Sequence, residues 1–311
     1  MAFWNKDNNG SQTLSDLIRG LQHSVNAGLK QLDGVGPCGE TIMDYSVYDA
    51  VRAGFGKVVF VIRKHFREEF EQKVVSKYKS VIEVELVEQE MDKLPEGFVL
   101  NPSREKPWGT GHATLMAAGV IDTPFAVINA DDFYGARSFQ VLADFLMEQE
   151  GKRGKYCMVG FDLDKTLSES GEVSRGICSV NEESYLITVE EHHKVKDVDG
   201  TITGVGMDGV EKVLDREAYA SMNMWGFTPD LFEYGMGLFV DFLKENADEP
   251  KKEFYIPFVV NSTINSGLSS VKVLRSSDKW FGVTFKEDRP VVVEMLKRMG
   301  ESGEYPMPLF G

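Results

Sequence analysis

The feature that most constrains the fold is the run Lys57-Val-Val-Phe-Val-Ile62, in which five consecutive side chains are apolar and four are β-branched. Such a run is typical of a strand that is covered on both faces. The run Phe125-Ala-Val-Ile128 has the same character. Two strands of this kind favour a sheet with helices on both sides.

Helical patterns alternate with the strand-like runs in the first half of the chain. Residues 41–53 carry apolar side chains at helical spacing. Further helices are predicted at 66–79, 112–119 and 138–149, and a further strand at 82–87. This βαβα order predicts an α/β class with a Rossmann-like, mixed and mainly parallel sheet that has helices on both faces.

The second half predicts a mixed region that closes over the first half. Its expected strands are 156–161, 177–180, 185–189 and 221–227, and its expected helices are 232–245 and 291–299. Residues 194–211 are rich in Gly, Asp and Val, and they predict a flexible excursion or a hairpin.

Residues 1–27 form a separate, atypical N-terminal segment in this prediction, before a main domain at 28–311. One stripe of an amphipathic helix is formed by Leu14, Leu17, Ile18, Leu21 and Val25. We expect this helix to serve packing or self-association, so a homo-oligomer is one expected assembly.

Composition limits the partners. A net charge of −15 would repel the phosphate backbone of a nucleic acid and an anionic membrane surface, but it leaves small phosphorylated substrates open. We find no apolar run of about 20 residues and no secretory signal pattern. The three cysteines, Cys38, Cys157 and Cys178, are scattered and predict reduced thiols, so we expect a cytoplasmic protein.

Two adjacent carboxylates, Asp131 and Asp132, follow the apolar strand at 125–128. Open α/β sheets bind ligands at the carboxyl ends of their strands, and Mg²⁺ prefers oxygen ligands that it shares with substrate phosphates. The alternative is that the two residues only cap the next helix.

A glycine-containing turn, Gly109-Thr-Gly111, precedes His112 and a predicted helix. Glycine allows a ligand to approach the backbone, and a helix start offers N–H groups; a tight turn with a cap is the alternative. The dinucleotide pattern G-x-G-x-x-G and the P-loop pattern do not occur, which disfavours a Rossmann oxidoreductase.

Several segments together resemble the bacterial NTP-transferase family, whose members join a nucleoside triphosphate to a sugar 1-phosphate and release pyrophosphate. These segments are Lys30–Pro37, Gly109–Ala113, Asn129–Gly135 and Ser221–Phe227. The resemblance covers about residues 28 to 311 in consistent order and implies the nucleotide-diphospho-sugar transferase fold.

The resemblance implies a role for each matching residue. Lys30 would contact phosphate and Asp131 would bind Mg²⁺. Nucleotide recognition falls to Gln89, Gly109, Thr110, Gly111 and His112, and sugar-phosphate recognition to Gly176, Glu191, Lys194 and Asn223. A sugar phosphate oxygen is already anionic, so the reaction requires positioning and charge neutralisation more than a general base.

The sequence departs from the family in two places. Family members begin with a strand and a Gly-rich, phosphate-binding loop, and residues 20–30 contain neither. Gly282 stands where many relatives supply a second metal aspartate, so Asp278 or Asp288 is expected to substitute, with Asp288 as our candidate. Activity is therefore in question, and the alternative is a catalytically silent nucleotide- or sugar-binding or scaffold protein of the same fold.

Overall fold

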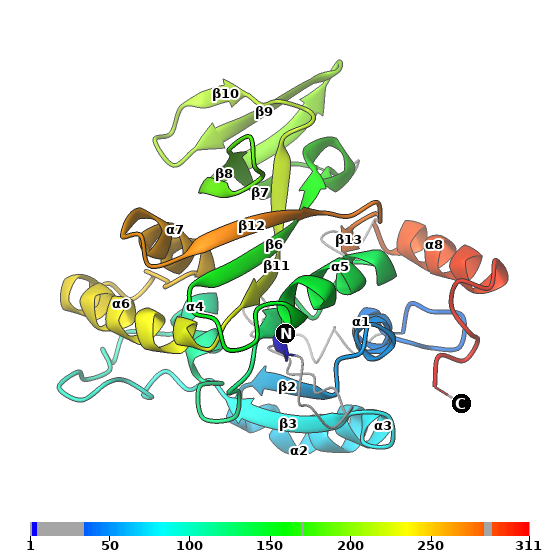
Figure 1. Cartoon of the computed structure of the whole chain (residues 1–311), viewed down its shortest axis with the longest axis horizontal. Coiled ribbons are helices and arrows are strands. Elements are labelled where there is room, and N and C mark those ends of the chain that lie inside the picture. Colours follow the sequence, from blue (N-terminus) through cyan, green and yellow to red (C-terminus); the bar gives the residue numbers. More distant parts are fainter. Residues whose placement is uncertain (1, 5–33, 169–170, 283–287, 311) are drawn as a thin grey trace.

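The computed structural model describes residues 2–4, 34–168, 171–282 and 288–310 (Figure 1). The stripe of apolar residues between 14 and 25, Lys30 and the predicted domain boundary lie outside these ranges. In chain order, the described elements are β1 (Ala2–Trp4), α1 (Ile42–Arg52), β2 (Lys57–Ile62), η2 (Lys64–Phe66), α2 (Arg67–Phe70), η3 (Glu71–Val75), α3 (Ser76–Tyr78), β3 (Glu83–Glu88), α4 (Thr110–Leu115), β4 (Phe125–Val127), β5 (Asp132–Phe133), α5 (Ala136–Met147), β6 (Lys155–Asp162), η4 (Leu163–Thr166), β7 (Val173–Val180), β8 (Leu186–Val198), β9 (Thr201–Gly206), β10 (Glu211–Val213), β11 (Tyr219–Phe227), α6 (Asp230–Asn246), α7 (Ile256–Asn265), β12 (Ser270–Arg275), β13 (Phe281–Gly282) and α8 (Arg289–Glu301).

The mixed α/β class that the sequence predicts is confirmed. The main sheet has the order β10-β9-β8-β7-β11-β4-β1-β2-β3, and β6 joins it by pairing with β11 and β12. Only the β2–β3 and β6–β12 pairs are parallel among the described strands. Nevertheless β2, β3, β4, β6 and β12 run in one direction, because β1 and β11 are the reversed strands that separate them.

The strand β1 lies between β2 and β4, inside the sheet. Its residues Ala2 and Phe3 pair with Val59 and Val58 of β2 on one side, and Ala2–Trp4 pair antiparallel with β4 on the other. The sequence patterns do not predict a strand there. Backbone N–H and C=O groups of two buried strands would otherwise face each other across this position without partners.

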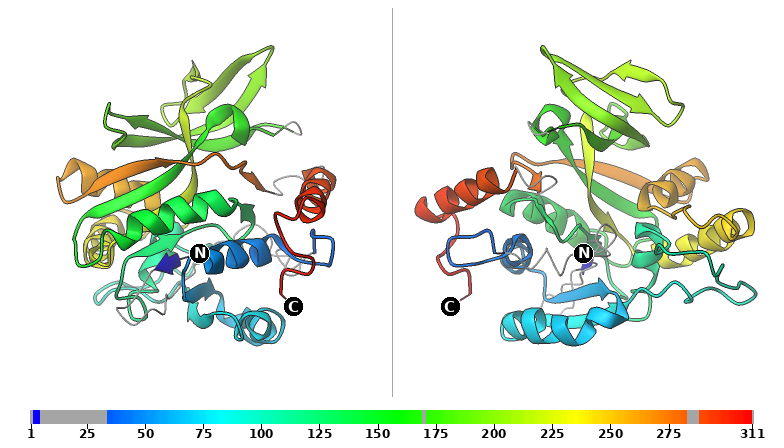
Figure 2. Two further views of the ribbon diagram at one scale, coloured as in Figure 1. Left: turned by 45° about the vertical axis from the view of Figure 1, so that its right-hand side comes forward. Right: turned by 180° about the vertical axis from the view of Figure 1, so that it is seen from behind.

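Alternate residues of β2 belong to two separate cores. Val58, Phe60 and Ile62 pack with α1, α2, α3 and α5 on one face of the sheet. Val59 and Val61 pack with α4, α6 and α7 on the other face. Figure 2 shows the two sets of helices on opposite sides of the strands, so the prediction of two-sided burial is confirmed.

Local sequence explains where α1 begins. Thr41 and Asp44 form a capping box, in which the Asp44 backbone N–H donates to the Thr41 hydroxyl at 3.2 Å and the Thr41 N–H donates to the Asp44 carboxylate at 2.7 Å. The box fixes the start of the helix that covers β2.

The second half projects a long antiparallel extension, β7 to β10, away from the helical layers (Figure 1). The predicted excursion at 194–211 is part of the β8–β9–β10 meander. Helix α7 and strand β12 are elements that the sequence patterns did not predict. Among the described residues, no helix is both long enough and apolar enough to cross a bilayer.

Candidate active site at the carboxyl edge of the sheet

The carboxyl ends of β2, β3, β4 and β6 lie along one edge of the sheet, since these strands run in the same direction. Gln89 directly follows β3, and the segment Asn129–Asp131 follows β4. Ligands of open α/β sheets bind at such an edge. The topology therefore places the predicted carboxylates and the predicted base-recognising glutamine on the same side of the molecule.

The two adjacent carboxylates at this edge differ sharply in exposure. Asp131 is exposed, whereas the side chain of Asp132 is buried. Asn129 Nδ2 donates to Asp132 Oδ2 at 2.9 Å, and the Tyr134 hydroxyl lies 3.3 Å from the same oxygen. Burial, and after it the charge of Asp131, raises the pKa of Asp132 well above its usual range, against the opposing hydrogen bond from Asn129.

The donor chemistry of this pair fits Mg²⁺. Among the described residues, no group of three or more His, Cys, Asp or Glu side chains is arranged to hold a metal ion. Mg²⁺ is usually held by one or two carboxylates and keeps waters and substrate phosphates as its other ligands. Asp131 and Asp132 are therefore oxygen donors of the kind that suits an ion shared with a substrate, and Asp131 is the exposed one of the two.

A side chain at position 282 would require the carboxylate of Asp132 to move. Gly282 pairs with Asp132 between β13 and β5, and a Cβ added at Gly282 would lie 2.7 Å from Asp132 Oδ1. The space that a side chain at 282 would need is therefore filled by the carboxylate of Asp132.

The two acidic residues expected to substitute at 282 have other contacts. Asp278 Oδ2 accepts from the backbone N–H groups of Arg137 at 2.6 Å and Ser138 at 3.1 Å, so Asp278 caps α5. Asp288 is the residue before α8, and its Oδ1 accepts from Ser168 Oγ at 3.2 Å. Metal binding by Asp288 stays a prediction.

The predicted nucleotide-binding residues come together around His112. Gln89 Nε2 donates to the Gly109 carbonyl at 3.0 Å and lies 3.3 Å from His112 Nδ1. His112 Nε2 lies 3.1 Å from the Lys93 carbonyl. Burial lowers the pKa of His112 to about 4, against the hydrogen bond to Lys93, so the ring is neutral near pH 7.

Packing within the protein accounts for both glycines of the turn. A Cβ on Gly109, which has a φ of 100°, would lie 2.7 Å from the Phe254 carbonyl oxygen, and a Cβ on Gly111 would lie 2.6 Å from the Phe254 ring. The Gly111 N–H donates to the Phe254 carbonyl at 2.8 Å. Thr110 Oγ1 accepts from the Ile256 N–H at 3.2 Å. The alternative of a tight turn is thus sufficient to explain these glycines.

The predicted sugar-binding residues meet where β7, β8 and β11 lie side by side. Gly176 pairs with Glu191 on β8 and with Ser221 on β11. A Cβ on Gly176 would lie 3.9 Å from Glu191 Oε2. Asn223 has a φ of 59° within the bulge of β11, and its N–H donates to Ser221 Oγ at 3.4 Å. The structure therefore brings together Gly176, Glu191 and Asn223, and the place where they meet is called the Glu191 corner below.

Lys194 lies farther along β8, at an irregular part of the strand. It is exposed and has a φ of 51°. The hydrogen bond from Lys196, and to a smaller extent the charge of Lys194, lowers the pKa of Glu172. His192 is buried and His193 is exposed, in agreement with the alternation expected for neighbours on a strand. Phosphate binding by Lys194 stays a prediction.

Arg175 is a residue of this region that the sequence patterns did not single out. It is buried beside Gly176, and burial lowers the pKa of its guanidinium to about 10 against the opposing charges of Asp132 and Glu191. Its position directly before Gly176 is the one available signal in the sequence.

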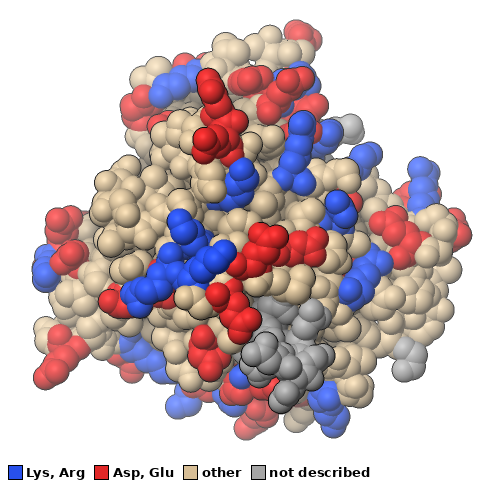
Figure 3. All heavy atoms as spheres, viewed as in Figure 1, with Lys and Arg blue, Asp and Glu red and all other residues tan. Residues whose placement is uncertain are grey.

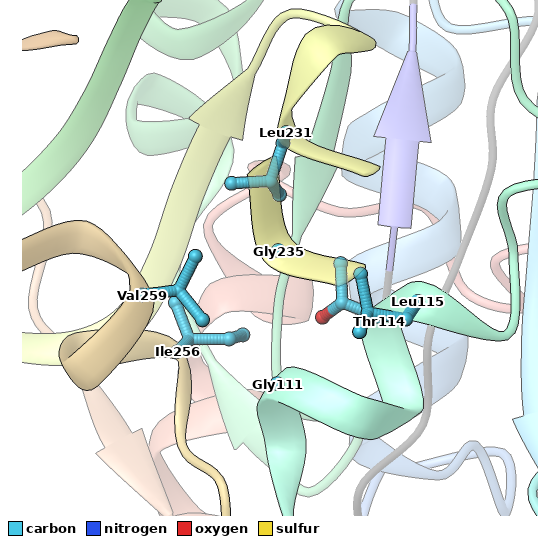
Figure 4. A pocket seen from close by; sticks show the side chains of 7 residues that line it. All are labelled: Gly111, Thr114, Leu115, Leu231, Gly235, Ile256 and Val259. Carbon is cyan, nitrogen blue, oxygen red and sulfur yellow. The ribbon is translucent and has the colours of Figure 1, made fainter. Parts of the chain in front are cut away.

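A small hollow lies among α4, α6 and α7, and Gly111 of the glycine turn is one of the residues that line it (Figure 4). It is lined by apolar side chains such as Leu115, Leu231 and Val259, and its volume of about 10 Å³ leaves room for one water at most. The surface in Figure 3 mixes acidic and basic side chains over the face shown. The carboxyl edge is therefore the stronger candidate for a ligand site.

The fold is similar to that of two solved nucleotidyltransferase structures. One similar structure is a Bacillus anthracis protein assigned as a glucose-1-phosphate thymidylyltransferase and crystallised in complex with a sucrose; the TM-score is 0.59 at 14% identity, over 91% of this chain and 95% of that chain. Another is the inositol-1-phosphate CTP transferase from T. maritima, with a TM-score of 0.57 at 13% identity, over 94% of this chain and 97% of that chain. No protein-family profile and no curated protein sequence matches the chain.

Proposed function

We propose that this protein transfers a nucleotidyl group from a nucleoside triphosphate to a sugar 1-phosphate and releases pyrophosphate. The observation that carries the proposal is the shared fold together with the predicted residues at one edge of the sheet: Asp131 and Asp132 after β4, Gln89 after β3, and Gly176, Glu191 and Asn223 at the β7–β8–β11 corner.

The chemistry agrees with what the site contains. An oxygen of the sugar phosphate attacks the α-phosphorus of the triphosphate; the bond to the bridging oxygen breaks, and pyrophosphate leaves with that electron pair. The attacking oxygen carries its negative charge already, so no base is needed. The neutral His112, held between Gln89 and the Lys93 carbonyl, suits a structural or base-recognising role more than proton transfer.

Asp131 and Asp132 would hold a Mg²⁺ ion. When bound, the ion would supply positive charge to the triphosphate. Gln89 and the turn at Gly109–Gly111 would orient the base, and the corner of Glu191 and Asn223 would orient the sugar. Lys30, Lys194 and Asp288 are proposed from the family resemblance to contact phosphate or metal.

The direct test is pyrophosphate release from the purified full chain with Mg²⁺ and a panel of nucleoside triphosphates and sugar 1-phosphates. We expect one pair to give turnover that is lost on removal of Mg²⁺ with a chelator. Calorimetry with the same panel distinguishes the alternative: binding of a nucleotide or sugar phosphate without turnover would identify a silent binding protein of this fold, and neither binding nor turnover would contradict the proposal.

A further inference from the structure

Arg175 is a buried cation on β7 that donates to the carbonyls of Thr166 and Ser174 and to the Thr166 hydroxyl. Its exposed fraction is 7%. Nε donates to the Thr166 carbonyl at 3.0 Å and Nη1 donates to the Ser174 carbonyl at 2.8 Å; Nη2 also donates to Thr166. Arginine is seldom buried so far unless its charge is compensated, and carbonyls satisfy hydrogen bonds without supplying a counter-charge.

Trp280 and Gly282 lie between Arg175 and Asp132. The guanidinium carbon lies 4.9 Å from the centroid of the Trp280 ring. A Cβ on Gly282 would lie 3.3 Å from that ring and 2.7 Å from Asp132 Oδ1. The guanidinium, the indole ring and the strand pair that carries Asp132 are therefore packed against one another.

On its other side, Arg175 adjoins the Glu191 corner, where the sugar is predicted to bind. It pairs with His192 across β7 and β8, and the next pair along the two strands is Gly176 with Glu191. The carboxylates of Asp132 and Glu191 both act on the charge of Arg175. One buried cation thus lies between the group proposed to hold the metal and the group proposed to hold the sugar.

We infer that Arg175 is a positioning residue. It joins η4, β7 and Trp280, and in this way it fixes Asp132 at the carboxyl edge of the sheet relative to the Glu191 corner. This inference rests on the proposed function for the identity of the two groups. Arg175 would act on Asp132 and Glu191 by charge and packing, since its hydrogen bonds go to Thr166 and Ser174. Its planar fork holds several carbonyls at once, which lysine cannot do.

The test is a titration of Mn²⁺, as a Mg²⁺ substitute, into the full chain without substrate. The concentration of free Mn²⁺ is measured by electron paramagnetic resonance. We expect Arg175→Gln to weaken Mn²⁺ binding about tenfold, as is typical when a group that supports metal ligands is removed. Arg175→Lys should recover part of the loss because the charge is kept. With an active protein, the KM for the triphosphate, which shares the metal ion, and the KM for the sugar 1-phosphate should both rise in Arg175→Gln.

Arg104→Gln is the matched control. Arg104 is also buried, stacks on a tryptophan, Trp108, at 3.4 Å, and donates to the carbonyls of Glu249 and Lys252. Its loss should lower the melting temperature without changing Mn²⁺ affinity. The inference is overturned if Arg175→Gln binds Mn²⁺ as the native chain does, if Arg104→Gln weakens binding equally, or if the native chain binds no Mn²⁺. Absence of turnover in the native chain would count against the proposed function alone, because the Mn²⁺ comparison needs no turnover.

Discussion

Nε2 of Gln89 faces Nδ1 of His112 at 3.3 Å, while Nε2 of the same ring lies 3.1 Å from the Lys93 carbonyl. The amide nitrogen can only donate and the carbonyl can only accept. This pair of contacts assigns the proton of the neutral ring to Nε2 and leaves Nδ1 as an acceptor. If Nδ1 were also protonated, its N–H would face the N–H of the Gln89 amide, and two buried donors would lack an acceptor.

This arrangement predicts how stability depends on pH. The pKa of His112 is lowered to about 4 by burial, from 6.5 in the unfolded chain. Between these two values the unfolded state binds the proton and the folded state does not, so the stabilisation present above pH 6.5 is lost as the pH falls towards 4. The change is on the order of 3 kcal/mol.

Urea denaturation of the native chain and of His112→Gln at several pH values measures this contribution. In the native chain, the uptake of about one proton by the unfolded state makes the free energy of unfolding fall between pH 6.5 and 4. His112→Gln should lack this part of the pH dependence. His65→Gln, which changes an exposed histidine instead, is the matched control. Equal slopes in the native chain and in His112→Gln would contradict the assignment of a neutral ring.

The glycine turn allows strain and steric contact to be separated. Gly109 has a φ of 100° and the Phe254 carbonyl oxygen 2.7 Å from its Cβ position, whereas Gly97 has a φ of 90° and no atom within 4 Å. Gly97→Ala should cost about 1 kcal/mol of unfolding free energy from the backbone conformation alone. Gly109→Ala should cost about 2 kcal/mol more, because backbone atoms must also move. Equal losses in chemical denaturation would show that the turn can shift freely away from Phe254.

The strands and helices of the first half were predictable because their patterns are local. The alternation of Val58 and Phe60 with Val59 between two cores follows from a continuous apolar run, and the start of α1 follows from Thr41 and Asp44. Helix α7 was missed because β-branched residues such as Val259 and Val260 favour strands, and its burial against α4 and β8 decides the outcome. The three residues of β1 are too few to show a period.

The site was predictable to a different degree for each residue. Asp131 stands after a recognisable strand, so its position at the carboxyl edge could be expected. Arg175 could not be recognised, because its environment depends on Trp280 and Asp132, which are distant in the sequence. The packing of the glycine turn on Phe254 likewise depends on a distant contact.

The interior position of β1, paired on both sides, predicts a large effect from a change at residue 3. Phe3 pairs with Val58 on one side and with Ala126 on the other. Phe3→Pro removes a backbone N–H within the sheet and should cost about 3 kcal/mol, because each buried group left unpaired costs about 1–3 kcal/mol. Val213→Pro, on the edge strand β10, should cost less than half as much in the same urea titration. A native-like midpoint for Phe3→Pro would show that β1 adds nothing to the pairing of β2 and β4.

The exposed carboxylate of Asp131 predicts a loss of function without a loss of fold. Asp131→Asn removes one charge proposed to hold Mg²⁺, so pyrophosphate release should fall about 100-fold, the scale expected when one electrostatic contact to the reacting groups is lost. Because the side chain is exposed, the free energy of unfolding should change by no more than about 0.5 kcal/mol. Asp122→Asn, an exposed residue just before β4 at the opposite end of that strand, is the control and should leave both quantities unchanged. Mn²⁺ binding measured on the same samples tests metal binding by Asp131 separately from its effect on turnover. If Asp131→Asn keeps the native Mn²⁺ affinity, Asp131 is not a metal ligand, even if turnover falls.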